Sequence, residues 1–283
     1  MKLLTINTHS LQEQNYPKKL EDFIDIIVQE RPDIVAMQEV NQSVDAPLAG
    51  RPLLCGYVPC PGNEIPIRED NHAAQAAFRF QFAGLHCSWT WVPAKIGYGK
   101  YDEGMAIFCF HDKIADIDSF YISKCHDYDN WKTRKVLGVR TAHMNNWYYT
   151  VHMGWWQDSE EPFLSQWEQF DSALYDKRDE ATLWLMGDFN SPAEIRGQGY
   201  DCITHSYWYD TYLLADQKDD GITVEGVIDG WRDQIPDPSS QKGMRIDHIW
   251  CSKPVQVRSS KVMFNHMNGP VISDHFGVMI ELL

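Results

Sequence analysis

The sequence predicts an α/β fold made of two packed, mixed β-sheets with helices on the outside. Three observations support this prediction: a β-α-β unit opens the chain, antiparallel strand runs fill its middle, and strands outnumber helices. No internal repeat, low-complexity tract or linker divides residues 1–283. We therefore expect a single domain, since chains of this length often form one core.

The N-terminal unit is the clearest element. Residues 2–7 (KLLTIN) are an apolar run typical of a short buried strand. A helix is predicted next, with Asn15 as its N-cap, a proline in its first turn and apolar residues spaced for one face. It must end near Arg31, because the residue before Pro32 is driven out of the helical conformation. Residues 33–40 (DIVAMQEV) then form the second strand.

The middle of the chain has an antiparallel character. Residues 104–110 and 117–123 are strand-like runs separated by a polar turn. Residues 134–143 and 147–153 flank Asn145-Asn146, which predicts a hairpin because Asn tolerates positive φ.

The remaining elements complete a strand-rich order. An amphipathic helix presents Phe163, Trp167, Phe170 and Leu174 on one face. Strand runs follow at residues 182–189, 244–251 and 277–283. This order suits two packed sheets better than a doubly wound parallel fold.

Charge and cysteine content narrow the functional classes. The net charge of −15 and the lack of a Lys/Arg-rich run weigh against a nucleic-acid partner. Small phosphate esters stay open, because a bound metal ion can neutralise them. Seven scattered cysteines predict reduced thiols in a cytoplasmic protein, and no apolar run reaches the ~18 residues of a membrane helix. The N-terminus does not read as a secretory signal, and no obligate protein partner is evident.

Polar residues stand beside the apolar runs at six separate places. They are Asn7, Glu39, His152, Asp188 with Asn190, Asp247 with His248, and Asp274 with His275. Ligand sites commonly form where several strand ends meet. Carboxylates and amides are ligands for Mg²⁺ or Mn²⁺, and imidazoles near carboxylates are the usual acid–base pairs. No cysteine accompanies them, which argues against a zinc–thiolate site.

Each of these residues also has a plain structural explanation. Asn7 and the GDFN stretch (residues 187–190) are turn formers, and a single histidine such as His152 is more often a core residue with its hydrogen bonds satisfied. A buried strand is a poor place for Glu39, however. The co-occurrence of all six segments favours a functional site.

In sequence order, the segments TIN, MQEV, EGMAIF, RKVLGV, VHM, GDFNSP, RIDHIW and SDHFGV resemble the endonuclease/exonuclease/phosphatase superfamily, which has the DNase I-like fold. The resemblance runs from Asn7 to the C-terminus. It looks closest to a branch of bacterial cytosolic proteins named after a streptococcal regulatory-locus protein. It implies a four-layer α/β/β/α sandwich and metal-dependent phosphoester hydrolysis, with Mg²⁺ as the expected ion and Mn²⁺ or Ca²⁺ as alternatives.

The resemblance also implies roles for single residues. Glu39 matches the principal metal ligand of the family, and Asn7 and Asp274 match residues close to the metal. Asp188 matches the aspartate that orients or deprotonates the attacking water. Asn190 matches the amide that contacts the scissile phosphate.

Two histidines complete this implied set. His275 matches the histidine that polarises the phosphate or acts as acid–base, and Asp247 matches its carboxylate partner. His152 matches a second histidine of the nuclease and sphingomyelinase branches. Glu103 falls where the carboxylate partner of that second histidine lies in pancreatic-type nucleases.

The substrate is less constrained by the sequence. Trp155 and Trp156 are candidate stacking residues beside the phosphate, although most aromatic clusters are core packing. Asp210 resembles a recurrent family position without an assigned role. Three functions stay open: a hydrolase of a small or lipid-like phosphodiester or phosphomonoester, a DNase I-type nuclease, and a non-catalytic regulatory binding module.

Overall fold

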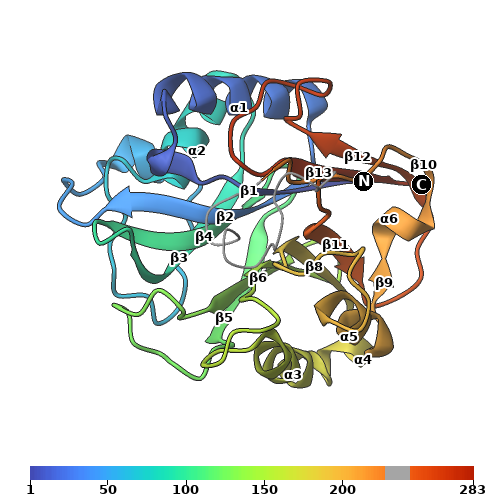
Figure 1. Ribbon diagram of the computed structural model, residues 1–283. Helices are drawn as coiled ribbons and strands as arrows, with labels where there is room; N and C mark the ends of the chain where they lie inside the picture. Colours follow the sequence, from blue (N-terminus) through green and yellow to red (C-terminus); the bar gives the residue numbers. More distant parts are fainter. Residues whose placement is uncertain (227–242) are drawn as a thin grey trace.

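The computed structural model describes residues 1–226 and 243–283 and consists of two β-sheets packed face to face (Figure 1). Helices α1 (Tyr16–Glu30) and α2 (His72–Phe82) cover the outer face of one sheet. Helices α3 (Phe163–Leu174), α4 (Lys177–Glu180) and α5 (Gly199–His205) lie on the outer side of the other. The predicted four-layer sandwich of two mixed sheets is confirmed.

The first sheet has seven strands in the order β10-β12-β13-β1-β2-β4-β3. Their bounds are β1 Lys2–Asn7, β2 Ile34–Ser43, β3 Ser88–Gly97, β4 Tyr101–Cys109, β10 Ala215–Lys218, β12 Val257–Met263 and β13 Gly277–Leu282. β1 and β2 run parallel and are joined by α1, as the sequence predicted. β13 pairs antiparallel with β1, so the two ends of the chain share the sheet centre.

The second sheet has six strands in the order β5-β6-β7-β8-β11-β9. Their bounds are β5 Ile114–Tyr121, β6 Lys135–Thr141, β7 Asn146–His152, β8 Thr182–Asp188, β9 Tyr209–Asp210 and β11 Asp247–Cys251. β6 and β7 form the predicted hairpin, and β7 runs parallel to β8 after the α3 crossover. The short helix α6 (Thr211–Leu214) follows β9.

Three apolar layers hold the sandwich together. Residues from both sheets form the central layer, including Leu3, Ile107, Leu137, Met186 and Ile280, and a second layer lies under α1 and α2. A third, rich in aromatic rings, lies under α3 and α5. Burial of these side chains, worth roughly 1.5–3 kcal/mol each, favours the folded state. No helix in the described ranges is long and apolar enough to cross a membrane.

Local details differ from the sequence predictions. Asn15 occupies the N-cap position of α1 but has φ of 57° and its side chain makes no capping hydrogen bond. Neither Asn145 nor Asn146 has positive φ, and Asn146 already belongs to β7. The runs at 104–110 and 117–123 do not pair with each other, because β4 and β5 belong to different sheets.

Candidate active site

One cavity of about 320 Å³ collects the polar strand ends. Its lining residues include Glu39 from β2, His152 from β7, Asp188 from β8, and Asp274 with His275 from the segment before β13. These positions come from both sheets, so the cavity lies where the ends of the two sheets meet. The volume lies within the range of small-molecule sites, which is roughly 300–1,000 Å³.

The backbone around Asp188 explains the glycine of the GDFN stretch. Asp188 is the last residue of β8 and pairs in register with His152 of the parallel neighbour β7. A Cβ at Gly187 would lie 2.1 Å from the carbonyl oxygen of Val151, so only glycine lets the strands approach this closely. Beyond the strand, the backbone N–H of Asn190 donates to Oδ1 of Asp188 at 2.8 Å and fixes its carboxylate.

His275 lies between two buried carboxylates. Its Nδ1 is 3.0 Å from Oδ2 of Asp247, and its Nε2 is 3.7 Å from Oδ2 of Asp188. Burial alone would lower the pKa of His275, but the charges of Asp247 and Asp188 hold it well above 6.5. Burial raises the pKa of Asp188 to about 7, against the opposing charge of His275. His275 is therefore the protonated member of the pair, and the Asp188 carboxylate can accept a proton near neutral pH.

Glu39 differs in position from the sequence prediction. It does not end β2 but lies inside it, at an irregularity in the β2–β4 register, with φ of 51°. Bulges of this kind redirect a side chain beside active sites. The amide of Asn7 donates to Oε1 of Glu39 at 2.9 Å and to Oδ2 of Asp188 at 3.2 Å, and so links the two carboxylates.

The residues around Glu39 fit a divalent cation. Burial raises the pKa of Glu39, and the nearby charges of Glu103 and Asp274 raise it further, while His9 opposes them. A cation would offset this concentration of negative charge. The available donors are carboxylate and amide oxygens, which suit Mg²⁺, Mn²⁺ or Ca²⁺. Glu39 and Asp274 line the cavity and would hold the ion, with Asn7 positioning Glu39.

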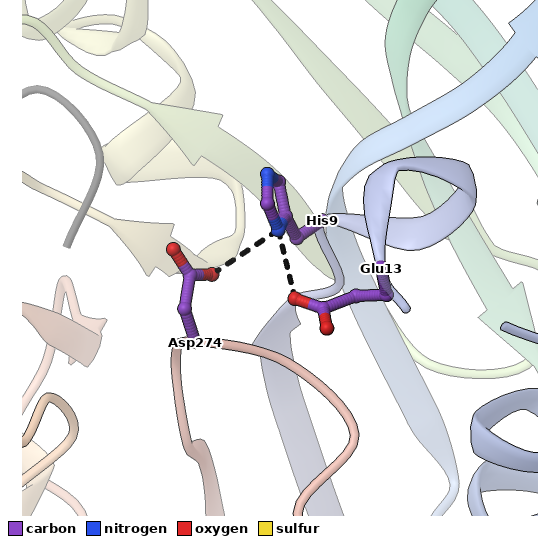
Figure 2. Close-up of side chains that lie close together, drawn as sticks. All are labelled: His9, Glu13 and Asp274. Carbon is purple, nitrogen blue, oxygen red and sulfur yellow. Dashed lines mark hydrogen bonds and ion pairs between the residues drawn. The ribbon is translucent and has the colours of Figure 1, made fainter. Parts of the chain in front are cut away.

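His9 joins the site without having been predicted. Figure 2 shows its ring between the carboxylates of Glu13 and Asp274: Nδ1 is 2.8 Å from Oε1 of Glu13 and 3.7 Å from Oδ1 of Asp274. Burial would lower the pKa of His9, but the hydrogen bond to Glu13 and the charges of Glu39 and Asp274 raise it to about 9. Its place two residues after Asn7, at the end of β1, is the only sequence signal for this residue.

The structure gives His152 other partners than the predicted Glu103. Glu103 forms its ion pair with Lys95, with Nζ and Oε1 3.1 Å apart. His152 instead places Nε2 at 3.6 Å from Oδ2 of Asp188 and 4.0 Å from Oε1 of Glu39. Burial, together with the positive charges of Arg134, Lys95 and His275, holds the pKa of His152 well below 6.5.

The other predicted residues divide between the cavity and its surroundings. Asn190 and Trp155 line the cavity, and the Asn190 amide donates to the carbonyl of Met153 at 2.9 Å. Trp156 packs against Phe163, with ring centroids 6.1 Å apart. Asp210 lies outside the cavity, where it is 4% exposed and pairs with Arg245 at 2.8 Å.

Seven lining residues were not among the predicted site residues: His9, Lys95, Ile96, Gly97, Tyr98, Trp131 and Arg134. Arg134 opens the RKVLGV segment, and Lys95 lies in β3, where a buried lysine is unusual. Either could have been noticed as a charge in an apolar strand. Only the three-dimensional fold places them beside His152.

Comparison with known proteins finds one matching family model and several solved structures with a similar fold. A family model described as the Endonuclease/Exonuclease/phosphatase family matches residues 4–275. A protein of that description from Leptotrichia buccalis C-1013-b is 29% identical, with a TM-score of 0.84 and coverage of 100% of this chain and 99% of that one. No curated protein matches the sequence.

Two further solved structures share the fold at lower identity. A mannosyl-6-phosphatase from Bacteroides thetaiotaomicron VPI-5482 is 15% identical, with a TM-score of 0.67 and coverage of 100% of this chain and 99% of that one. TDP2 from Caenorhabditis elegans is 14% identical, with a TM-score of 0.62 and coverage of 99% and 73%.

Proposed function

We propose that this member of the Endonuclease/Exonuclease/phosphatase family hydrolyses a phosphoester of a small molecule with the help of Mg²⁺. Membership of the family makes the chain a hydrolase that acts on ester bonds. The observation that carries this proposal is the contact series Asp247–His275–Asp188, which opens into the same cavity as Glu39. Mn²⁺ or Ca²⁺ are the alternative ions, since all three accept oxygen ligands. The cytosol is the proposed location, supported by seven free cysteines.

Under this proposal, each residue of the site has a defined role. Asp188, with a pKa of about 7, orients the attacking water and accepts its proton. His275 stays protonated beside Asp247 and donates a hydrogen bond to the charge that develops on the phosphoryl oxygens. The Asn190 side chain, just after β8, and neutral His152, at the end of β7, position the phosphate. A divalent cation bound by Glu39 and Asp274 would supply Lewis-acid stabilisation of the same charge.

The charge of the protein favours a small-molecule substrate over a nucleic acid. The net charge of −15 would repel a nucleic acid, and two of the chain's cations, Lys95 and Arg134, line the cavity and are both buried. The similar structures include a mannosyl-6-phosphatase, which agrees with a small phosphoester. A nuclease is the second candidate, because the His275–Asp247 pair is the arrangement that the resemblance to DNase I implies.

A substrate panel tests the proposal. The purified protein is assayed with Mg²⁺, Mn²⁺ or Ca²⁺ on p-nitrophenyl phosphate, bis(p-nitrophenyl) phosphate, hexose phosphates, sphingomyelin and plasmid DNA. We expect metal-dependent hydrolysis of a small phosphoester that falls about 10²-fold or more in Asp188→Asn. Cleavage of DNA alone would support the nuclease instead. Inactivity on every substrate with every ion would favour a non-catalytic binding module.

A further inference from the structure

Three aromatic side chains that line the cavity are defined here as the aromatic rim: Tyr98, Trp131 and Trp155. Tyr98 comes from the turn between β3 and β4, Trp131 from the segment before β6, and Trp155 from the segment after β7. Tyr98 is 46% exposed and Trp131 is 52% exposed. The two indoles lie 5.7 Å apart between ring centroids, tilted by 55°. Large rings gathered and exposed at one cavity are a typical sign of a ligand surface.

Trp131 is held firmly although its ring faces solvent. Its carbonyl oxygen accepts hydrogen bonds from Nζ of Lys95 and Nη1 of Arg134, both at 2.8 Å, and both donors belong to buried residues. The neighbouring Lys132 places its ammonium 5.4 Å from the Trp131 ring and pairs with Asp158 at 2.9 Å. These contacts tie the Trp131 segment to the segment that follows Trp155. The backbone of Trp131 is therefore fixed and its ring contacts Lys132 and Trp155, which lowers the entropic cost of binding.

Tyr98 and Trp155 are fixed by separate means. Tyr98 has φ of 52°, an uncommon conformation for a bulky residue, and its hydroxyl lies 2.9 Å from Nε2 of His9. Trp155 packs against the apolar cluster of Val224, Met244 and Ile246. Its indole Nε1 is buried and has no hydrogen-bond partner among the described residues, so the ring is held by packing. The rim thus presents fixed ring surfaces from three independent segments.

We propose that the aromatic rim binds the organic group of the phosphoester, and that this group is a ring with an apolar face that can stack on the rim. An aromatic ring and the apolar face of a sugar ring share this chemistry. The inference rests on the proposed function, because Asp188 and His275 hold the phosphate in the same cavity. Tilted, rigid indoles stack on flat faces, whereas a lipid chain would lose rotamer freedom without gaining a stacked contact. The rim therefore selects ring phosphoesters over lipid-like ones.

Two phosphonates of equal carbon number separate these alternatives. Phenylphosphonate carries a ring and hexylphosphonate a flexible chain, and neither is hydrolysed. Their binding with Mg²⁺ is measured by isothermal titration calorimetry on the wild type, Trp131→Ala, Trp131→Phe and Tyr207→Ala. Tyr207 is the matched control, because it is 82% exposed and does not line the cavity.

The expected result is selective. Trp131→Ala should weaken phenylphosphonate binding about 10-fold and hexylphosphonate binding less than about 3-fold, since a stacked ring typically contributes this much. Trp131→Phe should retain most of the ring preference, and Tyr207→Ala should change neither. Titration of a hexose 6-phosphate distinguishes sugar rings from aromatic rings. It is titrated into Asp188→Asn and into the Asp188→Asn/Trp131→Ala double variant. If the Trp131→Ala change weakens hexose 6-phosphate binding about as much as it weakens phenylphosphonate binding, the result supports a sugar.

Two outcomes would overturn the inference. One is an equal loss of both phosphonates in Trp131→Ala, and the other is failure of the wild type to bind either of them. Because phosphonate binding requires no turnover, the result is separate from the hydrolysis panel. Ring-selective binding without hydrolysis would contradict the proposed function but support ring binding at the aromatic rim. Hydrolysis together with preferential binding of hexylphosphonate would support the proposed function but contradict ring binding at the aromatic rim.

Discussion

Asp188 and Asp247 stand directly opposite each other in the antiparallel pair β8–β11, and the imidazole of His275 lies between their carboxylates. Like charges at opposed positions of a sheet destabilise it unless a cation separates them. His275 lies in the segment just before β13, a strand of the other sheet, so the contact also joins the two halves of the sandwich. The same three residues thus link the architecture to the proposed chemistry.

The first prediction concerns Asp247→Asn. The substitution removes the strongest raising influence on the pKa of His275, so that pKa should fall. Activity that depends on protonated His275 is lost as the pH rises through this pKa, so the alkaline limb of the kcat/KM profile should move to lower pH. We expect kcat to fall by about 10²–10⁴-fold. The measurement is a kcat/KM profile from pH 5 to 10 on the substrate identified by the panel.

Asp112→Asn provides the matched control for this profile. Asp112 pairs with the exposed His143, with Oδ1 and Nδ1 2.6 Å apart, away from the cavity. Its variant should keep the wild-type profile. An unchanged alkaline limb in Asp247→Asn would show that His275 does not act as the protonated group.

The second prediction concerns Glu39→Gln in the absence and presence of metal. Burial and the charges of Glu103 and Asp274 raise the pKa of Glu39, so the ionised group costs stability when no cation is bound. The metal-free variant should be at least as stable as the wild type. It should lose the Mg²⁺-dependent rise in Tm, which for a bound ion at 100 times its Kd corresponds to about 2.7 kcal/mol. Scanning calorimetry with EDTA and with Mg²⁺ measures both effects.

The exposed Glu64→Gln serves as control and should keep the metal response of the wild type. If Glu39→Gln still gained the full Mg²⁺ stabilisation, the assignment of Glu39 as a ligand would have to be abandoned.

Some parts of this fold could be predicted from the sequence because the signal was local. Apolar runs ending in Asn7, Asp188 and His152 indicated both the strands and the polar side chains at their ends. Helix α2 and strand β3, which carries Trp89 and Trp91, were not predicted from the sequence. In the structure both tryptophans are fully buried.

The missing site residues had no local signal of comparable strength. Lys95 in β3 and Arg134 just before β6 reach the cavity because these strands lie in different sheets whose ends meet, which depends on sheet packing. Glu103 was paired with His152 on resemblance alone, and a lysine that the resemblance did not include takes that carboxylate. The placement of the chain in a particular bacterial branch of the family stays a prediction.

The third prediction separates a structural role from a binding role for Asp210. Asp210 accepts a hydrogen bond from the Tyr200 hydroxyl at 2.7 Å and pairs with buried Arg245. Removing the carboxylate in Asp210→Ala leaves the Arg245 charge buried without its partner, which typically costs about 3–5 kcal/mol. KM should change little, since Asp210 does not line the cavity. Urea unfolding and steady-state kinetics on the same preparation measure the two quantities.

Asp116→Ala tests the same kind of ion pair at the surface. Asp116 pairs with Arg140, and both side chains are more than one-third exposed. Exposed pairs contribute about 0–1 kcal/mol, so this variant should unfold close to the wild type. A large rise in KM for Asp210→Ala with unchanged stability would return Asp210 to the substrate-binding residues.

The last prediction concerns the acid sensitivity of the fold. Burial, with the charge of Arg79 for His72 and of Arg245 for His248, lowers the pKa of each histidine to about 3. Below pH 6.5 the unfolded chain binds protons that the folded chain cannot, so stability falls as the pH decreases from 6.5 toward 3. At pH 5, each residue should account for about 2 kcal/mol of lost unfolding free energy. Urea unfolding at pH 7.5 and pH 5 measures this loss.

His72→Phe should remove about half of the loss that we attribute to the two histidines. The phenyl ring keeps most of the volume between α1 and α2 but gives up the 2.9 Å hydrogen bond between the Tyr16 hydroxyl and Nδ1, so stability at pH 7.5 should fall somewhat. The exposed His86→Gln should leave the pH dependence unchanged. An undiminished loss in His72→Phe would mean that His72 is protonated in the folded state, since only a group that stays neutral on folding can make the fold sensitive to acid in this way.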